Sequence, residues 1–504
     1  MYLSFMSLAD VSAEDLAYSN LRFFSEYCWG EEAGQVANGA FHDEWYNLLG
    51  AAVRPRRLHI QAAREHAKTE CLSVKYPLWR VGRDPNLRVM IVSKSATLAT
   101  TILREIRLNI EGNKRLRHVF PGLRAPGPRS GIPWSSDELQ VERSAGIILK
   151  DPTFTGVGLH GPLTGKRADL IVIDDPFDES EVRTENQRQK VEDWIEKVLL
   201  PTLTPDGELI AVGTPWHYDD YWVNLEAKSV EKGGNYVVLK YPAIKNYDPN
   251  QRVDEWDVQW PEVWSAERLA ERKKEIGSVK FACLYLLDPS GFEGALFKGS
   301  WLTYFDPGVF SDSGFTQGFE YYVGVDPNVS DNPESARLGI VTVAFDRPRG
   351  DLYVLDMYAE AVDFPTQIQK IVEYGTKSRV PFIPREVSIR KVGIEANAWQ
   401  QAVSKAAYVR GLPVEEIKQK QTKVERILGL QPHFENGRIR FPDPNKIRVN
   451  WWDKFESEYL SYPKGKYKDL MDALELAFTT ADVVREQSGP NFAFGPPMGM
   501  GGIR

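Results

Sequence analysis

Short apolar runs that end in acidic side chains mark the predicted strands of this chain. Leu170 to Ile173 is such a run, and Asp174 and Asp175 follow it directly. A continuous apolar run leaves no face for water, which is typical of a strand in a parallel sheet covered on both sides. Apolar runs at 88–93 and 209–212 predict further strands of the same kind. Taken alone, the first run is equally well explained as a core strand stopped by an Asp-Asp-Pro turn.

Helical periodicity separates these runs. Apolar residues recur at helical spacing within residues 1–50, 95–113 and 185–200, so strands and helices alternate. Residues 118–140 are rich in Pro, Gly and Ser and predict a surface excursion, after which residues 141–154 indicate a hairpin that leads into the acid-tipped strand. Strands that alternate with helices are typical of an α/β domain with a parallel sheet.

The second half of the chain has a different order of elements. An acid-tipped strand, two long strands, a helix, a second acid-tipped strand and an acidic helix are predicted in turn, at residues 321–326, 337–346, 351–360, 364–375, 391–395 and 467–478. This is the order of a ribonuclease-H-like fold. The chain is therefore expected to be α/β throughout, with a parallel-sheet domain followed by a ribonuclease-H-like domain.

The boundary between the two domains is predicted near residue 310, because the stretch 310–318 contains Gly and Ser and suits a hinge. Residues 1–310 then form the first domain, which includes a linker subdomain, and residues 311–486 form the second. Residues 487–504 are rich in Gly and Pro and have no core, so we expect a disordered tail.

Length and composition fit a large intracellular enzyme. The chain has 504 residues, of which 42% are hydrophobic, enough for more than one core. Its three cysteines, Cys28, Cys71 and Cys283, have no metal-ligand spacing and are expected to be reduced thiols in the cytosol. Without a long apolar run or a signal-like N-terminus, the protein is expected to be soluble, unexported and free of membrane partners. The net charge of -8 argues against coating nucleic acid indiscriminately, but not against a local basic groove.

Residues 62–70, AAREHAKTE, resemble a P-loop, G-x-x-x-x-G-K-[ST]. In that pattern backbone N–H groups surround nucleotide phosphates, the lysine reaches the β- and γ-phosphates, and the hydroxyl holds magnesium. Lys68 and Thr69 fit, but Ala62 and Ala67 replace both glycines. By itself the pattern favours a helix N-terminus with a solvated lysine; the acid-tipped strand that follows about a hundred residues later makes ATP binding the better explanation. The residues predicted to bind ATP in this loop are Arg64, Glu65, His66, Ala67, Lys68 and Thr69.

Two acids and a threonine complete the predicted nucleotide site. Asp174 and Asp175 lie at the carboxyl end of their strand, where ligands bind in open α/β sheets, and are predicted to hold magnesium and polarise a water. Asp174 and Thr69 are the predicted metal ligands, and Asp175 is the predicted catalytic acid. Thr214 follows the strand at 209–212 and is predicted to hydrogen-bond toward the γ-phosphate and report its loss. A capped turn is the alternative for Thr214 in isolation.

Acids on three predicted elements of the second domain indicate a metal-dependent nuclease. In a ribonuclease-H-like fold such carboxylates hold two divalent ions about 3.5 to 4 Å apart, which stabilise the attacking and leaving oxygens of a phosphodiester. Asp326, Glu395 and Asp472 are the predicted catalytic metal ligands, and Asp469 shares a helix face with Asp472. Hard oxygen ligands favour Mg²⁺ or Mn²⁺ over Zn²⁺. Each acid singly is better explained as a strand-end or helix-cap carboxylate; the three in this order favour the nuclease.

A cationic segment lies between the second and third of these acids. Lys418, Lys420, Lys423 and Arg426 are predicted to hold a DNA backbone beside the phosphodiesterase centre. A solvated run of charges is the alternative. A hairpin is predicted next, around residues 436–437.

The chain resembles the ATPase half of the large subunit of tailed-phage terminases, the motors that package viral DNA, in the order of four motifs: AAREHAKTE, IVSKSATLA, GVGLHGPLTGKRADLIVIDDP and AVGTPWHYDD. The resemblance implies an ATP-hydrolysing P-loop domain. The matching residues are Lys68 and Thr69 of the P-loop, Arg64 as the family's loop arginine, Asp174 as the magnesium-holding acid and Thr214 in the coupling motif. The chain departs from the usual pattern at Ala67, normally glycine, and at Asp175, where many P-loop ATPases have a catalytic glutamate.

The resemblance continues into the second half and covers most of residues 40 to 480. It implies a viral DNA-packaging motor that uses ATP to move double-stranded DNA into a procapsid, and an endonuclease that cuts concatemeric DNA. Asp326, Glu395 and Asp472 match the family's acidic triad, with Asp469 as an auxiliary acid. The implied cofactors are ATP and Mg²⁺, or Mn²⁺ at the nuclease site. The implied partners are DNA, the portal protein, a terminase small subunit and further copies in a ring on the portal, in the cytoplasm of the host cell.

Two other functions fit the same residues. One is a transposase- or resolvase-like nuclease whose P-loop no longer hydrolyses ATP. The other is a non-catalytic DNA clamp or portal adaptor. DNA-stimulated ATP turnover distinguishes the motor from both, and metal-dependent cutting distinguishes the clamp from the nucleases.

Overall fold

The chain divides into two compact units in the computed structural model. The first consists of residues 1–273 and 278–293, and the second of residues 274–277 and 294–504. The structure describes residues 12–30, 38–127, 131–230, 236–292, 296–311, 318–327, 337–378, 382–383, 387–395, 400–418 and 421–481. The tail predicted at 487–504, and most of the hinge predicted at 310–318, lie outside these residues.

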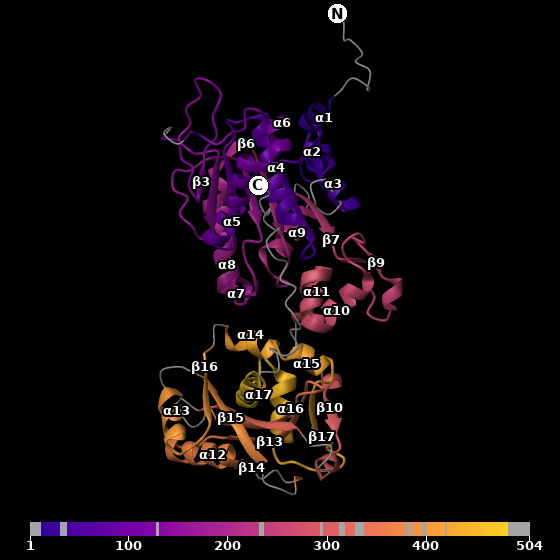
Figure 1. Cartoon of the computed structure of the whole chain (residues 1–504), viewed down its shortest axis with the longest axis vertical. Coiled ribbons are helices and arrows are strands. Elements are labelled where there is room, and N and C mark those ends of the chain that lie inside the picture. Colours follow the sequence, from indigo (N-terminus) through magenta and orange to yellow (C-terminus); the bar gives the residue numbers. More distant parts are fainter. Residues whose placement is uncertain are drawn as a thin grey trace, which may run out of the picture. The chain divides into compact units, whose positions relative to one another are not determined.

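A seven-stranded sheet forms the centre of the first unit (Figure 1), in the order β3-β4-β2-β5-β6-β1-β7. Every neighbouring pair is parallel except β3 and β4. The strands are β1 (Arg57–Ala62), β2 (Val89–Ser93), β3 (Glu138–Leu139), β4 (Phe154–Gly158), β5 (Ala168–Asp174), β6 (Leu203–Gly213) and β7 (Val237–Tyr241), and a separate pair is formed by β8 (Ile244–Lys245) and β9 (Asp257–Val258).

Burial of the central strands on both faces explains their continuous apolar runs. In β5, Ile171 and Ile173 pack in one core cluster with Trp194 and Trp222, which come from the helices after β5 and β6. Leu170 and Val172, the alternate residues of the strand, are equally inaccessible to solvent. A parallel strand covered by helices on both sides has no polar face, as the sequence predicts.

Helices cover this sheet and extend from it. Ser95 caps α5 by accepting a hydrogen bond from Leu98 N, and α5 packs against β2 and β4. Two π-helical segments, Thr69–Lys75 and Ile195–Leu199, follow the loop after β1 and the helix after β5. The α-helices are α1 (Ala13–Ser19), α2 (Leu21–Trp29), α3 (Ala40–Gly50), α4 (Tyr76–Arg83), α5 (Ala96–Gly112), α6 (Lys114–Val119), α7 (Glu179–Val182), α8 (Glu185–Trp194), α9 (Tyr221–Val230), α10 (Ala266–Ile276) and α11 (Ser278–Leu286).

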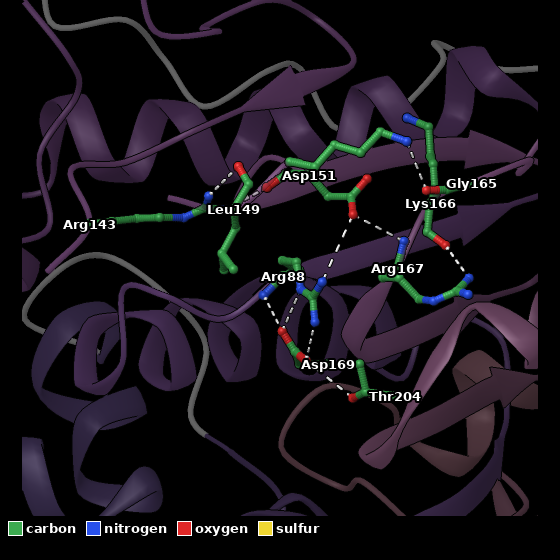
Figure 2. Close-up of polar contacts among 10 residues, drawn as sticks. Arg88, Arg143, Leu149, Asp151, Gly165, Lys166, Arg167, Asp169 and Thr204 are labelled. Carbon is green, nitrogen blue, oxygen red and sulfur yellow. Dashed lines mark hydrogen bonds and ion pairs between the residues drawn. The ribbon is translucent and has the colours of Figure 1, made fainter. Parts of the chain in front are cut away.

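The hairpin predicted at 141–154 forms only in part: residues 141–153 contain no strand, and a side chain binds backbone carbonyl groups there. Arg143 donates hydrogen bonds to the carbonyl oxygens of Leu149 (3.1 Å) and Asp151 (2.5 Å), which holds this segment in an irregular path (Figure 2). The strand at the end of this segment is β4, which pairs antiparallel with β3 on one side and parallel with β2 on the other.

The same region is tied to the residue before β2 by an ion pair, in which Arg88 lies 3.9 Å from Asp151. The Arg88 guanidinium donates to both carboxylate oxygens of Asp169, at 2.9 and 2.8 Å, and Thr204 donates to the same carboxylate at 3.1 Å (Figure 2). Asp151 accepts the backbone N–H of Arg167 at 3.2 Å. These contacts lie at the sheet edge opposite the acid-tipped end of β5, so they anchor the scaffold and leave the predicted site free.

The second unit is built on an eight-stranded mixed sheet (Figure 1), in the order β10-β17-β13-β12-β11-β15-β14, with β16 also paired to β15. β11, β12 and β13 form an antiparallel meander, and β15 pairs parallel to β11. The strands are β10 (Thr303–Phe305), β11 (Phe319–Asp326), β12 (Leu338–Asp346), β13 (Asp351–Glu360), β14 (Lys377–Ser378), β15 (Val387–Glu395), β16 (Val414–Ile417) and β17 (Ile439–Pro442).

Helices lie on both faces of this sheet. Apolar residues of α12 and α13 pack with alternate residues of β11, such as Val323 and Val325, in one core cluster. α17 lies on β11, β12 and β15 from the other side. The helices are α12 (Phe364–Thr376), α13 (Gln400–Val409), α14 (Lys423–Leu428), α15 (Gln431–Glu435), α16 (Trp452–Ser461) and α17 (Asp469–Thr480).

Two glycines allow α17 to approach the sheet closely. A Cβ atom at Gly324 would collide with the α17 backbone at Ala473 and Ala477, and one at Gly393 would collide with Thr480. Gly324 and Gly393 are register partners on the parallel strands β11 and β15. Because strand residues two apart share a face, the residues two positions further along each strand also face α17.

Two details of the second unit differ from the sequence interpretation. β10 pairs with β17, and Phe305 and Phe310 belong to the core of the second unit, so the compact units divide before residue 296, whereas the sequence predicts a boundary near 310. The hairpin expected around residues 436–437 is instead a turn from α15 into β17, with Gly437 at a positive φ of 65°. Local hydrogen bonds hold this helix and turn, from His433 N and Phe434 N to Leu430 O and from Gly437 N to Phe434 O.

The predicted fold class is confirmed: the chain is α/β, with a parallel-sheet domain of the P-loop type followed by a ribonuclease-H-like domain. All three cysteines are buried and free. Within the described residues, no helix has the length and apolar character needed to cross a membrane.

Candidate functional sites

The first site lies at the carboxyl edge of the parallel sheet. The predicted phosphate loop follows β1, Asp174 ends β5, and Thr214 comes directly after β6. β6 lies between β1 and β5, so the threonine is on the strand next to the acid-tipped one, as the sequence predicts. The carboxyl ends of parallel strands share one edge, which brings these residues together.

Lys68 is buried at the centre of this site, with 6% of its surface exposed. Its ammonium donates hydrogen bonds to the carbonyl oxygens of Ala62 at 2.6 Å and Ala63 at 3.2 Å, and to the Thr214 hydroxyl at 3.1 Å. Burial lowers the pKa of Lys68, while the charges of the neighbouring acids oppose that shift. A buried ammonium hydrogen-bonded to neutral acceptors is well placed to take an anionic group as a stronger partner.

Asp174 accepts hydrogen bonds from two hydroxyls of the segment that follows the loop. Thr69 Oγ1 donates to Oδ1 at 3.1 Å and Ser73 Oγ donates to Oδ2 at 2.6 Å. Burial raises the pKa of Asp174 to about 6, and the adjacent Asp175 charge contributes in the same direction. The sequence predicts Thr69 and Asp174 as a shared metal site. It does not single out Ser73, although a hydroxyl four residues after Thr69 at a helical start is a usable signal.

Asp175 connects the end of β5 to Thr214, the residue directly after β6. Its carboxylate accepts the backbone N–H of Thr214 at 3.2 Å, and its own N–H donates to Val212 O at 3.0 Å. The residue has a positive φ of 39°, an unusual conformation for a side chain other than glycine. Strained backbone of this kind is commonly held at functional sites by the surrounding contacts.

The loop itself adopts left-handed backbone at two residues that are not glycine. Glu65 and Ala67 have φ values of 61° and 55°. Ala67 is the residue that replaces a glycine, so the loop keeps a glycine-like shape at that position with a methyl group present. Glu65 is exposed and lies 3.9 Å from Arg272. Arg64 has an exposed side chain, and its backbone N–H donates to Leu284 O at 2.9 Å.

His66 anchors the loop from within. Its ring is fully buried, and Nδ1 lies 3.0 Å from the carbonyl oxygen of Arg64. The His66 carbonyl oxygen lies 3.1 Å from Nε2 of His42, at the start of α3. Burial lowers the pKa of His66 and of His42 to about 4, so both rings are neutral at pH 7. His66, predicted to contact the nucleotide, therefore supports the loop from behind.

These residues fit a nucleotide with a divalent ion. Within the described part of the chain, the hydrogen bonds of the Lys68 ammonium go to neutral oxygens, so it can accept a phosphate charge. A threonine hydroxyl and an aspartate oxygen lie within 3.1 Å of each other, and both are hard ligands suited to Mg²⁺.

The second site is formed where β11, β15 and α17 meet. Val325 and Ile394 are register partners, so Asp326 and Glu395 end two adjacent parallel strands side by side. Both acids lie two residues beyond the glycines that seat α17, and thus face that helix. Asp469 and Asp472 occupy the first turn of α17. The structure therefore brings the four predicted acids to the junction of β11, β15 and α17.

Lys423, the first residue of α14, inserts between two of these acids. Its ammonium lies 3.1 Å from Asp326 Oδ2 and 2.5 Å from Asp472 Oδ2. Burial raises the pKa values of Asp326 and Asp472, with Lys423 opposing the shift, and the two acids raise the pKa of Lys423. The lysine that the sequence predicts to hold a DNA backbone is, in this structure, the counterion of the acidic site.

Arg426 is the second internal counterion. Its guanidinium lies 3.4 Å from Glu395 Oε2 and forms a close ion pair with Glu475. Glu475 is a buried acid that sequence reasoning missed, although it follows Asp472 by three residues on the same helix and so shares its face. Of the other two predicted cations, Lys418 is exposed and Lys420 lies outside the described residues.

The acids are not arranged as a preformed metal cluster. Among the residues that the structure describes, no three His, Cys, Asp or Glu side chains are grouped closely enough to hold an ion. Oδ2 of Asp469 and Oδ1 of Asp472 are nevertheless among the buried carboxylate oxygens that lack hydrogen-bond partners in the described residues. Buried anionic oxygens normally have partners, so these two fit a cation that displaces Lys423. The donor set consists of hard carboxylates, which suits Mg²⁺ or Mn²⁺.

Comparison with known proteins supports the resemblance seen in the motifs. A segment of 259 residues, 47% of the chain, is 27% identical to "Terminase, large subunit" of Enterobacteria phage T3, and the match spans only 41% of that protein's length. No protein-family model matches the chain.

Solved structures with a similar arrangement include two phage proteins. The large terminase from a thermophilic bacteriophage is 13% identical, with a TM-score of 0.49 over 88% of this chain and 99% of that one. The HK97 bacteriophage large terminase is 13% identical, with a TM-score of 0.40 over 92% and 99%. The similarity predicted from the motif order is confirmed, and the chain is similar to the large subunit of phage terminases.

Proposed function

We propose that this chain is a viral DNA-packaging motor that hydrolyses ATP to translocate double-stranded DNA, and that its second unit is a two-metal endonuclease for concatemeric DNA. The observation that carries the proposal is the presence of two separate constellations in one chain: Lys68, Thr69, Asp174 and Thr214 at one sheet edge, and Asp326, Glu395, Asp469 and Asp472 around another. Neither rival function accounts for both.

In the proposed ATPase, ATP phosphates replace the neutral acceptors now bonded to Lys68. The ammonium then neutralises charge that develops on the γ-phosphate as its bond to the bridging oxygen breaks. Thr69 and Asp174 would hold the magnesium ion, which when bound screens the phosphate charges. Asp175 would orient the attacking water and accept its proton. Thr214, bonded to Lys68 through its hydroxyl and to Asp175 through its N–H, links both groups to the loop after β6.

In the proposed nuclease, Asp326, Glu395 and Asp472 would hold the divalent ions, with Asp469 as the auxiliary ligand. Bound ions of this kind activate a water and stabilise the leaving oxygen of a phosphodiester. Lys423 and Arg426 neutralise the buried acids in the ion-free chain. Once displaced, Lys423 stays on the rim as a cation for the DNA backbone, which reconciles its predicted role with its present contacts.

The biological setting is proposed from the relative's name. The motif resemblance, together with that name, leads us to propose as partners a portal protein, a small subunit and further copies in a ring on the procapsid in the host cytoplasm. We also assign the motor to the first compact unit and the nuclease to the second, close to the division predicted at residues 310/311.

The decisive experiment measures both activities of the purified chain. We expect ATP turnover that rises with double-stranded DNA, and Mg²⁺- or Mn²⁺-dependent plasmid cleavage that Asp326→Ala abolishes while ATP turnover stays near wild type. ATP turnover that ignores DNA would favour the resolvase-like nuclease. If neither activity occurs, the clamp is the better account. Cleavage at the wild-type rate in Asp326→Ala would exclude the proposed nuclease site.

A further inference from the structure

The amino end of α17 is capped by a residue from another helix. A helix leaves its first N–H groups without intrahelical partners, and Ser, Thr, Asn or Asp normally caps them. The residue at the cap position of α17 is Lys468, whose side chain makes no capping hydrogen bond. The carboxylate of Glu458, on α16, instead accepts the backbone N–H of Leu470 at 2.8 Å. The cap therefore comes from a residue twelve positions earlier in the chain.

The burial of the Glu458 carboxylate opposes folding. The residue is 4% exposed, and its second carboxylate oxygen is buried without a hydrogen-bond partner among the described residues. The charged groups that face it are Arg337 and Asp469, one of each sign. Burying an acid without a full set of partners opposes folding, so core packing alone would favour an apolar residue here.

The turn that Glu458 caps is the turn that carries two of the proposed metal ligands. Leu470 lies between Asp469 and Asp472, and all three belong to the first turn of α17. A shift of this turn would move both acids relative to Asp326, which is fixed on β11. Metal sites depend on such outer contacts, because the geometry of the ligands is set by what holds them.

We propose that Glu458 is a positioning residue of the nuclease site: by capping α17 from α16 it fixes where Asp469 and Asp472 meet the acid at the end of β11. The proposal rests on the proposed nuclease function. It gives Glu458 no contact with DNA or with the ions themselves.

The test compares substitutions at Glu458 in the full chain. Glu458→Gln keeps an acceptor oxygen for Leu470 N and should bind Mn²⁺ and cut DNA nearly as the wild type does. Glu458→Leu removes the acceptor and should weaken Mn²⁺ binding, and raise the Mg²⁺ concentration for half-maximal cleavage, by roughly 10- to 100-fold, as loss of outer contacts does at other metal sites. Mn²⁺ binding without DNA is measured by electron paramagnetic resonance, with Asp326→Ala defining the signal from sites elsewhere.

Controls keep the outcomes distinct. Glu456→Ala removes an acid two positions earlier on α16, which a helix places on a different face from Glu458, and should leave Mn²⁺ binding unchanged. Thermal unfolding followed by circular dichroism shows whether the second unit, which contains Glu458, is folded. If Glu458→Leu does not fold, Glu458→Asp takes its place, because a side chain shorter by one methylene withdraws from Leu470 and should weaken binding in the same direction.

Two results would overturn the proposal: wild-type Mn²⁺ affinity in Glu458→Leu or Glu458→Asp, or a Glu458→Gln variant as defective as Glu458→Leu. Failure of the nuclease assignment gives a different result, because the wild-type chain would then show no Mn²⁺ binding that Asp326→Ala removes.

Discussion

The ammonium of Lys68 donates a hydrogen bond to the Thr214 hydroxyl across 3.1 Å, which joins the loop after β1 to the loop after β6. Among the described residues, the hydrogen bonds of the Lys68 ammonium go to neutral acceptors. A γ-phosphate in the same place would draw the ammonium away, so the presence or absence of that phosphate changes what Thr214 contacts. The pair is therefore a direct physical link between the proposed site of hydrolysis and the segment that leads into α9.

We predict that Lys68→Ala lowers ATP turnover at least about 10²- to 10³-fold, because the variant lacks the charge that neutralises the γ-phosphate in the transition state. Cleavage of plasmid DNA should stay near wild type, since the second unit has its own residues. Turnover is measured as phosphate release with saturating ATP and DNA. Lys228→Ala is the matched control, because this lysine of the first unit pairs with partly exposed acids on α8 and the π-helical segment after it. Near-normal turnover in Lys68→Ala would show that the loop is not the hydrolytic site.

Because the pKa of Asp174 is raised, we predict that Asp174→Asn, which replaces the carboxyl with a neutral amide, stabilises the first unit at neutral pH. The folded pKa of about 6 exceeds the usual value of 3.8, so the folded state binds the extra proton between these pH values. The stability that this carboxyl contributes is complete below about pH 4 and is lost as pH rises through about 6. Asp174→Asn is neutral at every pH. Its free energy of unfolding should equal that of the wild type near pH 4. Above pH 6 it should exceed that of the wild type by at most about 3 kcal/mol.

Thermal unfolding in EDTA, without nucleotide, measures this difference from pH 4 to pH 8. The same variant should have lost ATP turnover, because an amide is a poor magnesium ligand. Asp206→Asn is the control, since Asp206 is an exposed acid on β6 and its replacement should leave the melting temperature nearly unchanged. A melting temperature for Asp174→Asn below that of the wild type at pH 8 would mean that the carboxylate is stabilised by its hydroxyl donors more than it is penalised by burial.

The sequence predicted the elements that carry the sites because their physical signals are local. An apolar run followed by an acid marks a buried strand and its exposed end, and this placed Asp174, Asp326 and Glu395 correctly at strand ends. The position of Thr214 at the end of β6 also followed, since Leu209 to Val212 form a buried apolar run directly before it.

What the sequence could not supply were contacts between distant segments. The ion pairs of Lys423 with Asp326 and Asp472 depend on where α14 packs, and a charge run looks the same in sequence whether it is solvated or inserted. The inward role of His66 depends on His42 of α3, twenty-four residues earlier. The position of β10 was missed because a three-residue strand carries no usable periodicity.

The pairing of β10 with β17 predicts where the second unit can be cut from the chain. Phe305 and Phe310 pack in the same core cluster as Tyr353, so a fragment that starts at residue 311 lacks two buried aromatic side chains. Each such loss typically costs about 3 to 5 kcal/mol. We expect a fragment of residues 294–504 to unfold cooperatively and cut DNA with Mn²⁺, and a fragment of residues 311–504 to be far less stable or insoluble. Circular dichroism melts and plasmid digestion of both fragments test this, and equal stability would show that β10 is dispensable.

The last prediction concerns the internal counterion of the nuclease site. Lys423 neutralises two buried acids without an ion present, and removing it leaves Asp326 and Asp472 to repel each other. We predict that Lys423→Ala lowers the stability of the ion-free second unit by about 1 to 2 kcal/mol, because the lysine is half-exposed and its pairs are partly screened. Added Mn²⁺ should then raise the melting temperature of Lys423→Ala more than that of the wild type, since the ion no longer competes with the ammonium.

Differential scanning calorimetry with EDTA or with Mn²⁺ separates the two effects. Lys446→Ala is the matched control, because this lysine of the second unit pairs with the exposed Asp306 and should change neither melting temperature nor ion response. If Lys423 only fills space, Lys423→Met will restore the wild-type behaviour. If it acts through its charge, Lys423→Met will behave as Lys423→Ala does, with a larger response to Mn²⁺. An unchanged or smaller response in both variants would contradict competition between lysine and ion, and would place the divalent site away from Asp326 and Asp472.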